Sequence, residues 1–278
     1  MKKINRRSFL AAAGLTAAAL ALTACGGSAS STASSTASSA ASSEAASNSA
    51  AAELTTVEAG KLTMATNAAF PPYEMTTDAG EFEGIDIDTA KAIAEKLGLE
   101  LQIDDMDFDA ALLSVQQGKA DIVMAGVTVT DERKAVMDFS DSYATGIQSI
   151  IVPEGSDITS PDDLAGKKIG TQRGTTGYIY CSDDFGDDAV VAYDDGLTAV
   201  QALNIGQVDA VVIDNAPAKE FVAANPGLVI LDTSYAEEDY AIGLAKGSAL
   251  EDAVNATLEE LKADGTLQSI VDKYITAE

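Results

Sequence analysis

The 278-residue sequence has no histidine, no tryptophan and only two cysteines, Cys25 and Cys181. Without histidine, the chain lacks the usual base of serine and cysteine hydrolases and the usual nitrogen ligand of zinc sites. Basic residues are also scarce, because 17 Lys and Arg residues stand against 44 Asp and Glu residues. The net charge of -27 repels nucleic acid and anionic lipid headgroups, so we expect neither to be bound through charge.

The N-terminal segment has the pattern of an export signal. Two lysines and two arginines in residues 2–7 precede an apolar stretch at residues 9–22, which is too short for a comfortable permanent membrane span. The stretch ends in the letters LTAC, which resemble the lipobox of bacterial lipoproteins, where the cysteine carries the lipid. We therefore predict a lipoprotein signal peptide at residues 1–25 and lipidation at Cys25. The paired arginines also resemble a twin-arginine signal, so the sequence leaves the export route undecided.

Residues 26–56 consist mostly of serine, alanine and threonine. This composition predicts a disordered tether between a lipid anchor and the folded part. About 220 residues follow, enough for one large domain or two small lobes. With lipid on Cys25, Cys181 has no cysteine left for an intrachain disulfide.

Asp105, Asp107 and Asp109 alternate as in a calcium-binding loop. Ala110 stands where such a loop needs glycine, and Gln116 stands where it needs a bidentate glutamate. We interpret this run as a solvated loop and helix start, and we expect no metal and no cofactor.

Short apolar runs alternate with amphipathic segments in the rest of the chain. The patterns predict strands at residues 61–66, 121–125, 168–171, 209–213 and 241–245. They predict helices at residues 88–97, 108–117, 197–203, 216–224, 250–262 and 267–274. Such alternation is typical of α/β lobes with mainly parallel sheets.

Two segments about ninety residues apart repeat one pattern. VQQGKADIVMA (residues 115–125) and LNIGQVDAVVI (residues 203–213) both read as a helix end, a glycine, an aspartate and a hydrophobic strand. The repeat suggests two similar lobes, although the same succession also recurs in unrelated parts of α/β proteins. Polar residues follow each strand, at the edge where open α/β sheets bind ligands.

Seven motifs in order resemble the polar amino-acid substrate-binding proteins of ABC importers, solute-binding protein family 3. They are ATNAAFPPYE (65–74), GIDID (84–88), MDF (106–108), AGVTVTDER (125–133), DFSDSY (138–143), GTT (174–176) and ADGT (263–266). The resemblance implies an α/β, two-lobed periplasmic-binding-protein-like (type II) fold with two hinge crossovers, near residues 143–151 and 231–240. Lobe 1 would comprise residues 57–147 and 238–278, and lobe 2 residues 148–237, in a protein expected to be a monomer.

A free amino acid needs a cation for its carboxylate and an anion for its ammonium group. Arginine suits a carboxylate because its planar guanidinium donates two parallel hydrogen bonds. The resemblance places the carboxylate on Arg133, Thr128 and the backbone of Gly126, with Thr176 arriving from lobe 2. It places the ammonium group on Asp214. The alternatives are a surface ion pair of Arg133 with Asp131 or Asp138 and a helix N-cap for Asp214, and the cap is compatible with binding.

The same resemblance places Phe70 and Phe108 against the ligand side chain, and the small Ala125 lets the ligand approach the backbone. Asn67 and Gln172 stand where some relatives have charged residues. Because a buried cationic side chain without a counter-ion is costly, we expect a polar, uncharged ligand such as glutamine. Arginine or another basic amino acid is the alternative, with Glu74 as a candidate acid for the site.

These observations together predict an extracytoplasmic receptor that delivers an amino acid to an ABC permease. It would be lipid-anchored at the outer face of the cytoplasmic membrane or in the periplasm. We do not expect an enzyme, although some proteins of this fold resemble cyclohexadienyl dehydratases. A sensor or adhesion lipoprotein with the same pocket is a third alternative.

Overall fold

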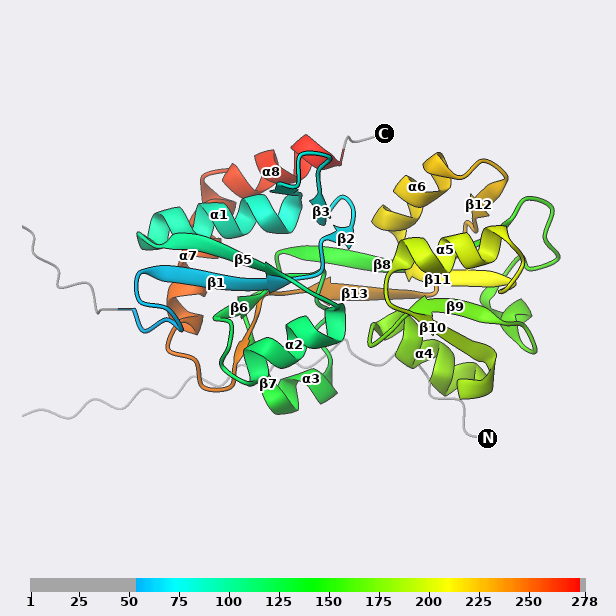
Figure 1. Ribbon diagram of the computed structural model, residues 1–278, viewed down its shortest axis with the longest axis horizontal. Coiled ribbons are helices and arrows are strands. Elements are labelled where there is room, and N and C mark those ends of the chain that lie inside the picture. Colours follow the sequence, from blue (N-terminus) through cyan, green and yellow to red (C-terminus); the bar gives the residue numbers. More distant parts are fainter. Residues whose placement is uncertain (1–53, 276–278) are drawn as a thin grey trace, which may run out of the picture. The chain divides into compact units, whose positions relative to one another are not determined.

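Two large β-sheets and the helices that cover them organise residues 54–275, the part of the chain that the computed structural model describes (Figure 1). The predicted signal peptide, Cys25 and most of the predicted tether lie outside these residues. No helix within residues 54–275 is long and apolar enough to cross a membrane. We call the first sheet with its helices lobe 1 and the second sheet with its helices lobe 2.

Lobe 1 consists of a five-stranded sheet, a small three-stranded sheet and their helices. Its strands are β1 (Lys61–Thr66), β2 (Ala69–Phe70), β3 (Glu74–Thr76), β4 (Phe82–Glu83), β5 (Glu100–Asp105), β6 (Ile122–Val123), β7 (Met137–Phe139) and β14 (Gly243–Ala245). Its helices are α1 (Ile85–Leu97), α2 (Phe108–Gln116), α3 (Asp131–Val136), α7 (Glu251–Ala263) and α8 (Thr266–Tyr274). The larger sheet has the order β5-β1-β6-β14-β7.

The core of lobe 1 has two layers because successive side chains of a strand point to opposite faces. Met64 of β1 packs with residues of α1, α7 and α8, whereas the next residue, Ala65, packs with residues of α2. The same alternation separates Ile122 from Val123 in β6. The sheet is therefore covered by helices on both faces.

Lobe 2 is built around a sheet with the order β10-β9-β11-β8-β12, and β13 also pairs with β8. Its strands are β8 (Ala144–Pro153), β9 (Ile169–Gln172), β10 (Val190–Tyr193), β11 (Ala210–Asp214), β12 (Leu228–Ile230) and β13 (Ala236–Tyr240). Its helices are α4 (Thr176–Phe185), α5 (Gly196–Asn204) and α6 (Asn215–Ala224), with short 3-10 turns at Pro161–Leu164 and Asp187–Ala189. In β11, Val212 packs in the core that contains Cys181 of α4, and its neighbours Val211 and Ile213 pack with residues of α5 and α6.

Two strands carry the chain between the lobes. β8 leads from lobe 1 into lobe 2, and β13 leads back, and the two pair antiparallel from Gln148 opposite Ala236 to Ala144 opposite Tyr240. The predicted two-lobed α/β fold with two hinge crossovers is thereby confirmed. The lobe boundaries predicted at residues 148 and 238 fall within these two strands and remain a prediction.

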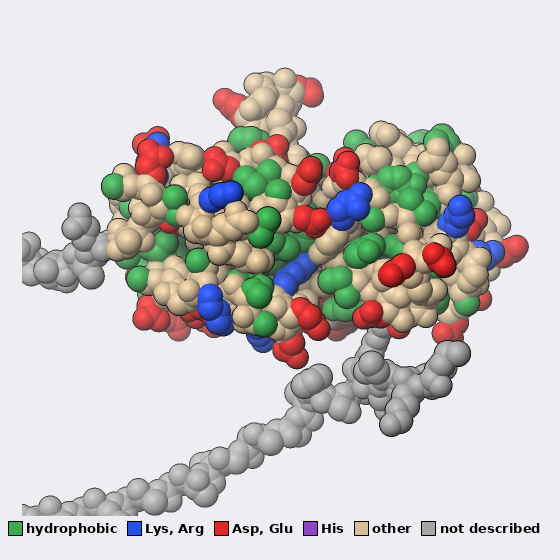
Figure 2. All heavy atoms as spheres, turned by 60° about the horizontal axis from the view of Figure 1, so that its bottom comes forward, with side chains coloured by type: hydrophobic (Ala, Val, Ile, Leu, Met, Phe, Trp, Pro, Cys, Tyr) green, Lys and Arg blue, Asp and Glu red, His purple; other side chains and the backbone are tan. Residues whose placement is uncertain are grey.

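Most predicted helices and strands are confirmed, but the prediction of mainly parallel sheets is wrong. β14 runs antiparallel to β6 and β7, and β8 runs antiparallel to β11 and β12. The reason is that β8 is itself a crossover strand and β14 directly follows the other crossover strand, β13. Both therefore run opposite to the strands that helices connect within each lobe. The strand expected at residues 121–125 is shortened to Ile122–Val123. Acidic side chains are scattered over both lobes in Figure 2, as the net charge predicts.

Candidate functional site

A pocket lies between the lobes, and the space inside its outline amounts to about 440 Å³ including open solvent. Its wall contains all ten predicted ligand-binding residues: Asn67, Phe70, Phe108, Ala125, Gly126, Thr128, Arg133, Gln172, Thr176 and Asp214. Six further residues complete the wall: Glu74, Gln148, Thr175, Val212, Ile213 and Tyr240. The pocket lies where β1, β6, β9 and β11 end, the edge at which open α/β sheets bind ligands. The structure thus brings the ten residues together, and their binding roles remain predictions.

Arg133 is a buried cation that has no acidic partner among residues 54–275. It lies in α3, whose N-cap Thr130 accepts a hydrogen bond from the Arg133 backbone N–H at 3.2 Å. The side chain is folded inward: Nη1 donates to the carbonyl of Thr128 at 2.7 Å, and Nη2 donates to the carbonyl of Gly174, in lobe 2, at 3.1 Å.

The guanidinium also lies 5.4 Å from the centre of the Phe108 ring. Within residues 54–275 no carboxylate is within ion-pair distance of it, and Asp138, one alternative partner, pairs with Lys246 instead. Burial lowers the pKa of Arg133, and the charge of Glu238 acts in the opposite direction. A buried charge of this kind is costly unless an anion compensates it.

The N-terminus of α4 faces the same pocket. Thr175 caps this helix by accepting a hydrogen bond from the Tyr178 N–H at 3.3 Å, and both Thr175 and Thr176 line the wall. The first N–H groups of a helix have no partner within the helix, and the helix dipole places positive partial charge there. Together with Arg133, this end of α4 favours an anionic group in the pocket.

Asp214 is the complementary buried acid. It ends β11 and caps α6, accepting hydrogen bonds from Ala216 N–H at 2.9 Å and Ile147 N–H at 2.8 Å. Burial raises its pKa to about 6, although these hydrogen bonds act in the opposite direction. No Lys or Arg of the described residues lies within ion-pair distance of it. Asp214 therefore serves as a helix cap and also presents an uncompensated acid to the pocket.

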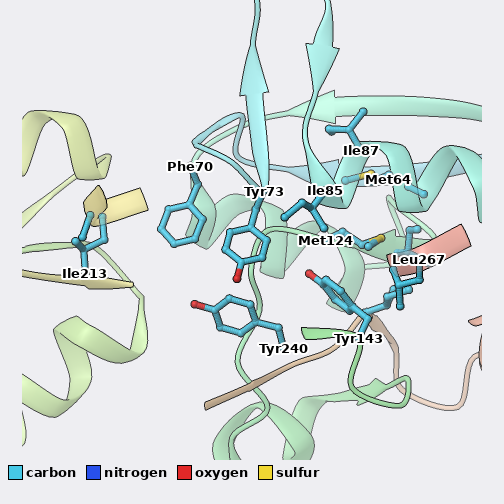
Figure 3. Close-up of a cluster of buried hydrophobic side chains, with 14 of the residues drawn as sticks. Met64, Phe70, Tyr73, Ile85, Ile87, Met124, Tyr143, Ile213, Tyr240 and Leu267 are labelled. Atoms are coloured by element: carbon cyan, nitrogen blue, oxygen red, sulfur yellow. The ribbon is translucent and has the colours of Figure 1, made fainter. Parts of the chain in front are cut away.

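Aromatic side chains form much of the apolar part of the wall, together with Ala125, Val212 and Ile213. Figure 3 shows the ring of Phe70 between Ile213 and Tyr73. Phe70 stacks on Tyr73 with ring centres 5.9 Å apart, and Tyr73 meets Tyr240 edge to face at 5.4 Å. Such rings can cover an aliphatic chain or stack on a planar amide or guanidinium.

The two predicted neutral residues bond to each other across the cleft. Gln172 Nε2 donates to Asn67 Oδ1 at 2.8 Å, and Asn67 Nδ2 donates to the carbonyl of Met106 at 2.9 Å. With the bond from Arg133 to Gly174, these contacts hold the described structure in a closed arrangement. The amides place no formal charge on this part of the wall.

Glu74 is a pocket residue that was named only as an alternative from the sequence. It is fully buried, and apart from the neighbouring Asp86 no described group satisfies its oxygens. Burial, followed by the charge of Asp86, raises the pKa of Glu74 well above its ordinary value. Asp86 accepts a hydrogen bond from Gly126 N–H at 3.0 Å, and burial raises its pKa to about 6. The strand and helix that carry these acids can meet only because Gly84 has no side chain, since a Cβ there would overlap the Tyr73 carbonyl.

Sequence reasoning missed Gln148, Tyr240 and Glu238. Glu238 lies behind the wall and accepts hydrogen bonds from the hydroxyls of Thr128 and Thr176, both at 2.9 Å. A signal was available, because alternation along β13 places residue 238 on the same side as the buried Tyr240.

The acidic side chains of residues 105–109 make separate contacts. No group of three or more His, Cys, Asp or Glu side chains among residues 54–275 is arranged to hold a metal ion. Asp105 instead accepts a hydrogen bond from Ala68 N–H at 2.8 Å. Asp107 and Asp109 line a second pocket together with Phe108, Arg173 and Asp194.

The sequence profile of the bacterial extracellular solute-binding proteins, family 3, matches residues 62–277. The chain is a member of this family. The resemblance inferred from the seven motifs is thereby confirmed.

Binding proteins named for different amino acids are similar to this chain. The L-cystine-binding protein TcyJ of Escherichia coli K12 is 32% identical over 226 residues, which cover 80% of this chain and 85% of TcyJ. The arginine-binding extracellular protein ArtP of Bacillus subtilis is 32% identical over 230 residues, covering 78% and 87%. The solved structure of an ancestral arginine-binding protein bound to glutamine is 42% identical, with a TM-score of 0.75, and the match covers 78% of this chain and 99% of that one. These relatives are named as binding proteins rather than enzymes.

Proposed function

We propose that this protein is the extracytoplasmic receptor of an ABC importer, which captures a free L-amino acid and delivers it to the permease. The main support for this proposal is that one pocket holds a buried cation, Arg133, and a buried acid, Asp214. Neither has a partner of opposite charge within residues 54–275. A zwitterion supplies both missing charges in one molecule, so each buried group gains the partner that it lacks.

Binding follows from this arrangement. The ligand carboxylate accepts from Arg133 and from the N–H groups at the start of α4, while the ammonium group donates to Asp214. The first two groups come from different lobes, so a bound ligand favours the closed form. The closed form then docks on the permease, because a ligand stabilises the state to which it binds more tightly.

The side-chain part of the pocket supports glutamine as the ligand. Asn67 and Gln172 carry no charge, and burial raises the pKa of Glu74, which favours its neutral, protonated form. A protonated carboxyl group can donate to the carbonyl of a side-chain amide. Phe70 and Phe108 cover the aliphatic part of such a ligand.

Arginine is the second candidate, and Glu74 is the observation that favours it. A guanidinium group would find two buried carboxylate oxygens there once Glu74 loses its proton, and it could stack on the aromatic wall. The ancestral relative, named as an arginine-binding protein and solved with glutamine, is consistent with a pocket that accepts either side chain.

Isothermal titration calorimetry of the purified protein against the common amino acids tests whether the protein is an amino-acid receptor and whether glutamine is its ligand. Saturable binding of at least one amino acid supports the receptor, and no binding of any of them at millimolar concentration would overturn it. Glu74→Gln separates the two ligands. This change should preserve glutamine binding within about tenfold and weaken arginine binding by about a hundredfold, because it removes a charge-assisted pair. If arginine binds more tightly than glutamine to the unmodified protein, arginine replaces glutamine as the assigned ligand.

A further inference from the structure

Glu238 is a buried acid at the point where the hinge strands and both lobes meet. It lies on β13, opposite Gly146 of β8, and its side chain is 5% exposed. It does not line the pocket itself. Thr128, Gln148 and Thr176, which do line the pocket, separate it from the ligand space.

One oxygen of Glu238 receives three hydrogen bonds from three parts of the fold. Oε2 accepts from the hydroxyl of Thr128 in lobe 1 and from the hydroxyl of Thr176 in lobe 2, both at 2.9 Å. It also accepts from Gln148 Nε2, on the crossover strand β8, at 3.1 Å. The two hydroxyl oxygens are 3.4 Å apart. Glu238 is therefore a junction between the lobes that needs no ligand.

These bonds also fix the direction of the two hydroxyl groups. A threonine hydroxyl has one proton to donate and two lone pairs that accept. Because Thr128 and Thr176 both donate to Glu238, each can offer only an acceptor toward the pocket. This differs from the sequence expectation that both hydroxyls help to hold a carboxylate, which requires them to donate.

The charge of Glu238 matters as well. It acts on Arg133, raising the pKa of the guanidinium against the effect of burial. No ion pair forms between them, so the guanidinium stays available to a ligand.

We propose that Glu238 is a positioning residue that clasps Thr128 and Thr176 together across the cleft and turns their lone pairs toward the ligand. The clasp favours the closed form before a ligand arrives, and it makes this part of the wall an acceptor for the ligand's ammonium group rather than a donor to its carboxylate. The second statement rests on the proposed function, whereas the first does not.

Glu238→Met tests the clasp, because methionine has a similar length but no strong acceptor. Glu238→Gln is the conservative variant, since its carbonyl oxygen can still accept from the hydroxyls. Glu237→Met, at the exposed neighbouring position on β13, is the matched control. Should Glu238→Met fail to fold, Thr176→Val removes one of the three donors without placing an apolar side chain at the junction.

Two measurements report on the proposal. Small-angle X-ray scattering of the ligand-free protein should show a larger radius of gyration for Glu238→Met than for the unmodified protein, with Glu238→Gln in between and Glu237→Met unchanged. Titration with the amino acid that binds the unmodified protein should show affinity reduced about tenfold or more by Glu238→Met and less by Glu238→Gln. In a protein that already carries Thr128→Val, adding Glu238→Met should reduce the affinity by a smaller factor, because Glu238 acts through the Thr128 hydroxyl.

Three results would overturn the proposal. The first is an unchanged radius of gyration in both Glu238→Met and Thr176→Val. The second is equal or tighter ligand binding by Glu238→Met. The third is an affinity reduction by Glu238→Met that is just as large when Thr128→Val is also present. Tighter binding would mean that Glu238 competes with the ligand carboxylate. Absence of binding by the unmodified protein would instead defeat the proposed function, while the ligand-free scattering experiment would still decide on the clasp.

Discussion

Replacing Arg133 by methionine separates the contribution of its charge to binding from its contribution to the fold. Methionine keeps an unbranched apolar stem of similar reach, so the contact with the Phe108 ring is largely preserved. What disappears is the guanidinium, with its two hydrogen bonds to the carbonyls of Thr128 and Gly174. The variant therefore leaves Asp214 and the start of α4 in place while removing the cation that is proposed to bind the ligand carboxylate.

The expected magnitude follows from burial. Arg133 is 8% exposed, so a ligand carboxylate that meets it is also removed from water. Removing one partner of such a buried pair costs roughly 3–5 kcal/mol. Since about 1.4 kcal/mol corresponds to a tenfold change, we expect at least about a hundredfold loss of affinity. The unfolding free energy without ligand should change by less than about 2 kcal/mol, because loss of an uncompensated buried charge offsets the two lost hydrogen bonds.

Calorimetry at pH 7 gives the affinity, and urea unfolding without ligand gives the stability. Arg173→Met is the matched control, because Arg173 is also an arginine near the cleft but its side chain is 54% exposed and pairs with Asp194. This control should bind within about threefold of the unmodified protein, as exposed ion pairs contribute little. Binding by Arg133→Met within tenfold of the unmodified protein, or an equal loss in Arg173→Met, would refute the assignment of Arg133 as the carboxylate partner.

Three further predictions concern the opposite end of the ligand and the closure of the lobes. Asp214→Asn should lower affinity at pH 7 by about tenfold or more while keeping the α6 cap, which calorimetry and thermal unfolding measure together. Because burial raises the pKa of Asp214 to about 6, affinity should fall as the pH drops below about 6, where protonation removes the charge that meets the ammonium group. A pH titration of affinity should show this fall in the unmodified protein, and its persistence in Asp214→Asn would contradict the assignment. Gly174→Ala should weaken binding by about tenfold, because Gly174 has a φ of +74° and a Cβ there would overlap the Asp109 carboxylate across the cleft. Adding Asp109→Ala should restore part of that loss, and no restoration would show that closure does not bring these residues together.

The residues of the pocket could be predicted from the sequence because they belong to local motifs. Thr128 and Arg133 lie in one stretch, at the point where a short strand passes into a helix, and that order alone places them at the ligand-binding edge of a sheet. Asp214 follows the same logic at the end of β11. The charge balance helped too, since a buried arginine is conspicuous in a chain with few basic residues.

What the sequence could not supply depends on segments that meet only in the folded chain. Glu238 is distant in sequence from Thr128 and Thr176, so its three hydrogen bonds become visible only when β13 lies beside β8. The burial of Glu74 likewise depends on the approach of Gly84 to the Tyr73 carbonyl. The antiparallel strands were missed for a related reason, because local periodicity shows that a strand exists but not the lobe from which it arrives.

The pocket combines two opposing contributions to closure. Glu238, and the bond from Gln172 to Asn67, join the lobes without a ligand. Arg133 and Asp214 oppose closure in the absence of a ligand, because closing the lobes removes both charges from water without pairing them. In the proposed binding mode, a zwitterion reverses the second contribution and leaves the first unchanged. Ligand binding therefore needs to supply only the free-energy difference between these two contributions to shift the population toward the closed form. That difference, rather than the number of ligand contacts, determines how well the permease can distinguish the ligand-bound receptor from the ligand-free one.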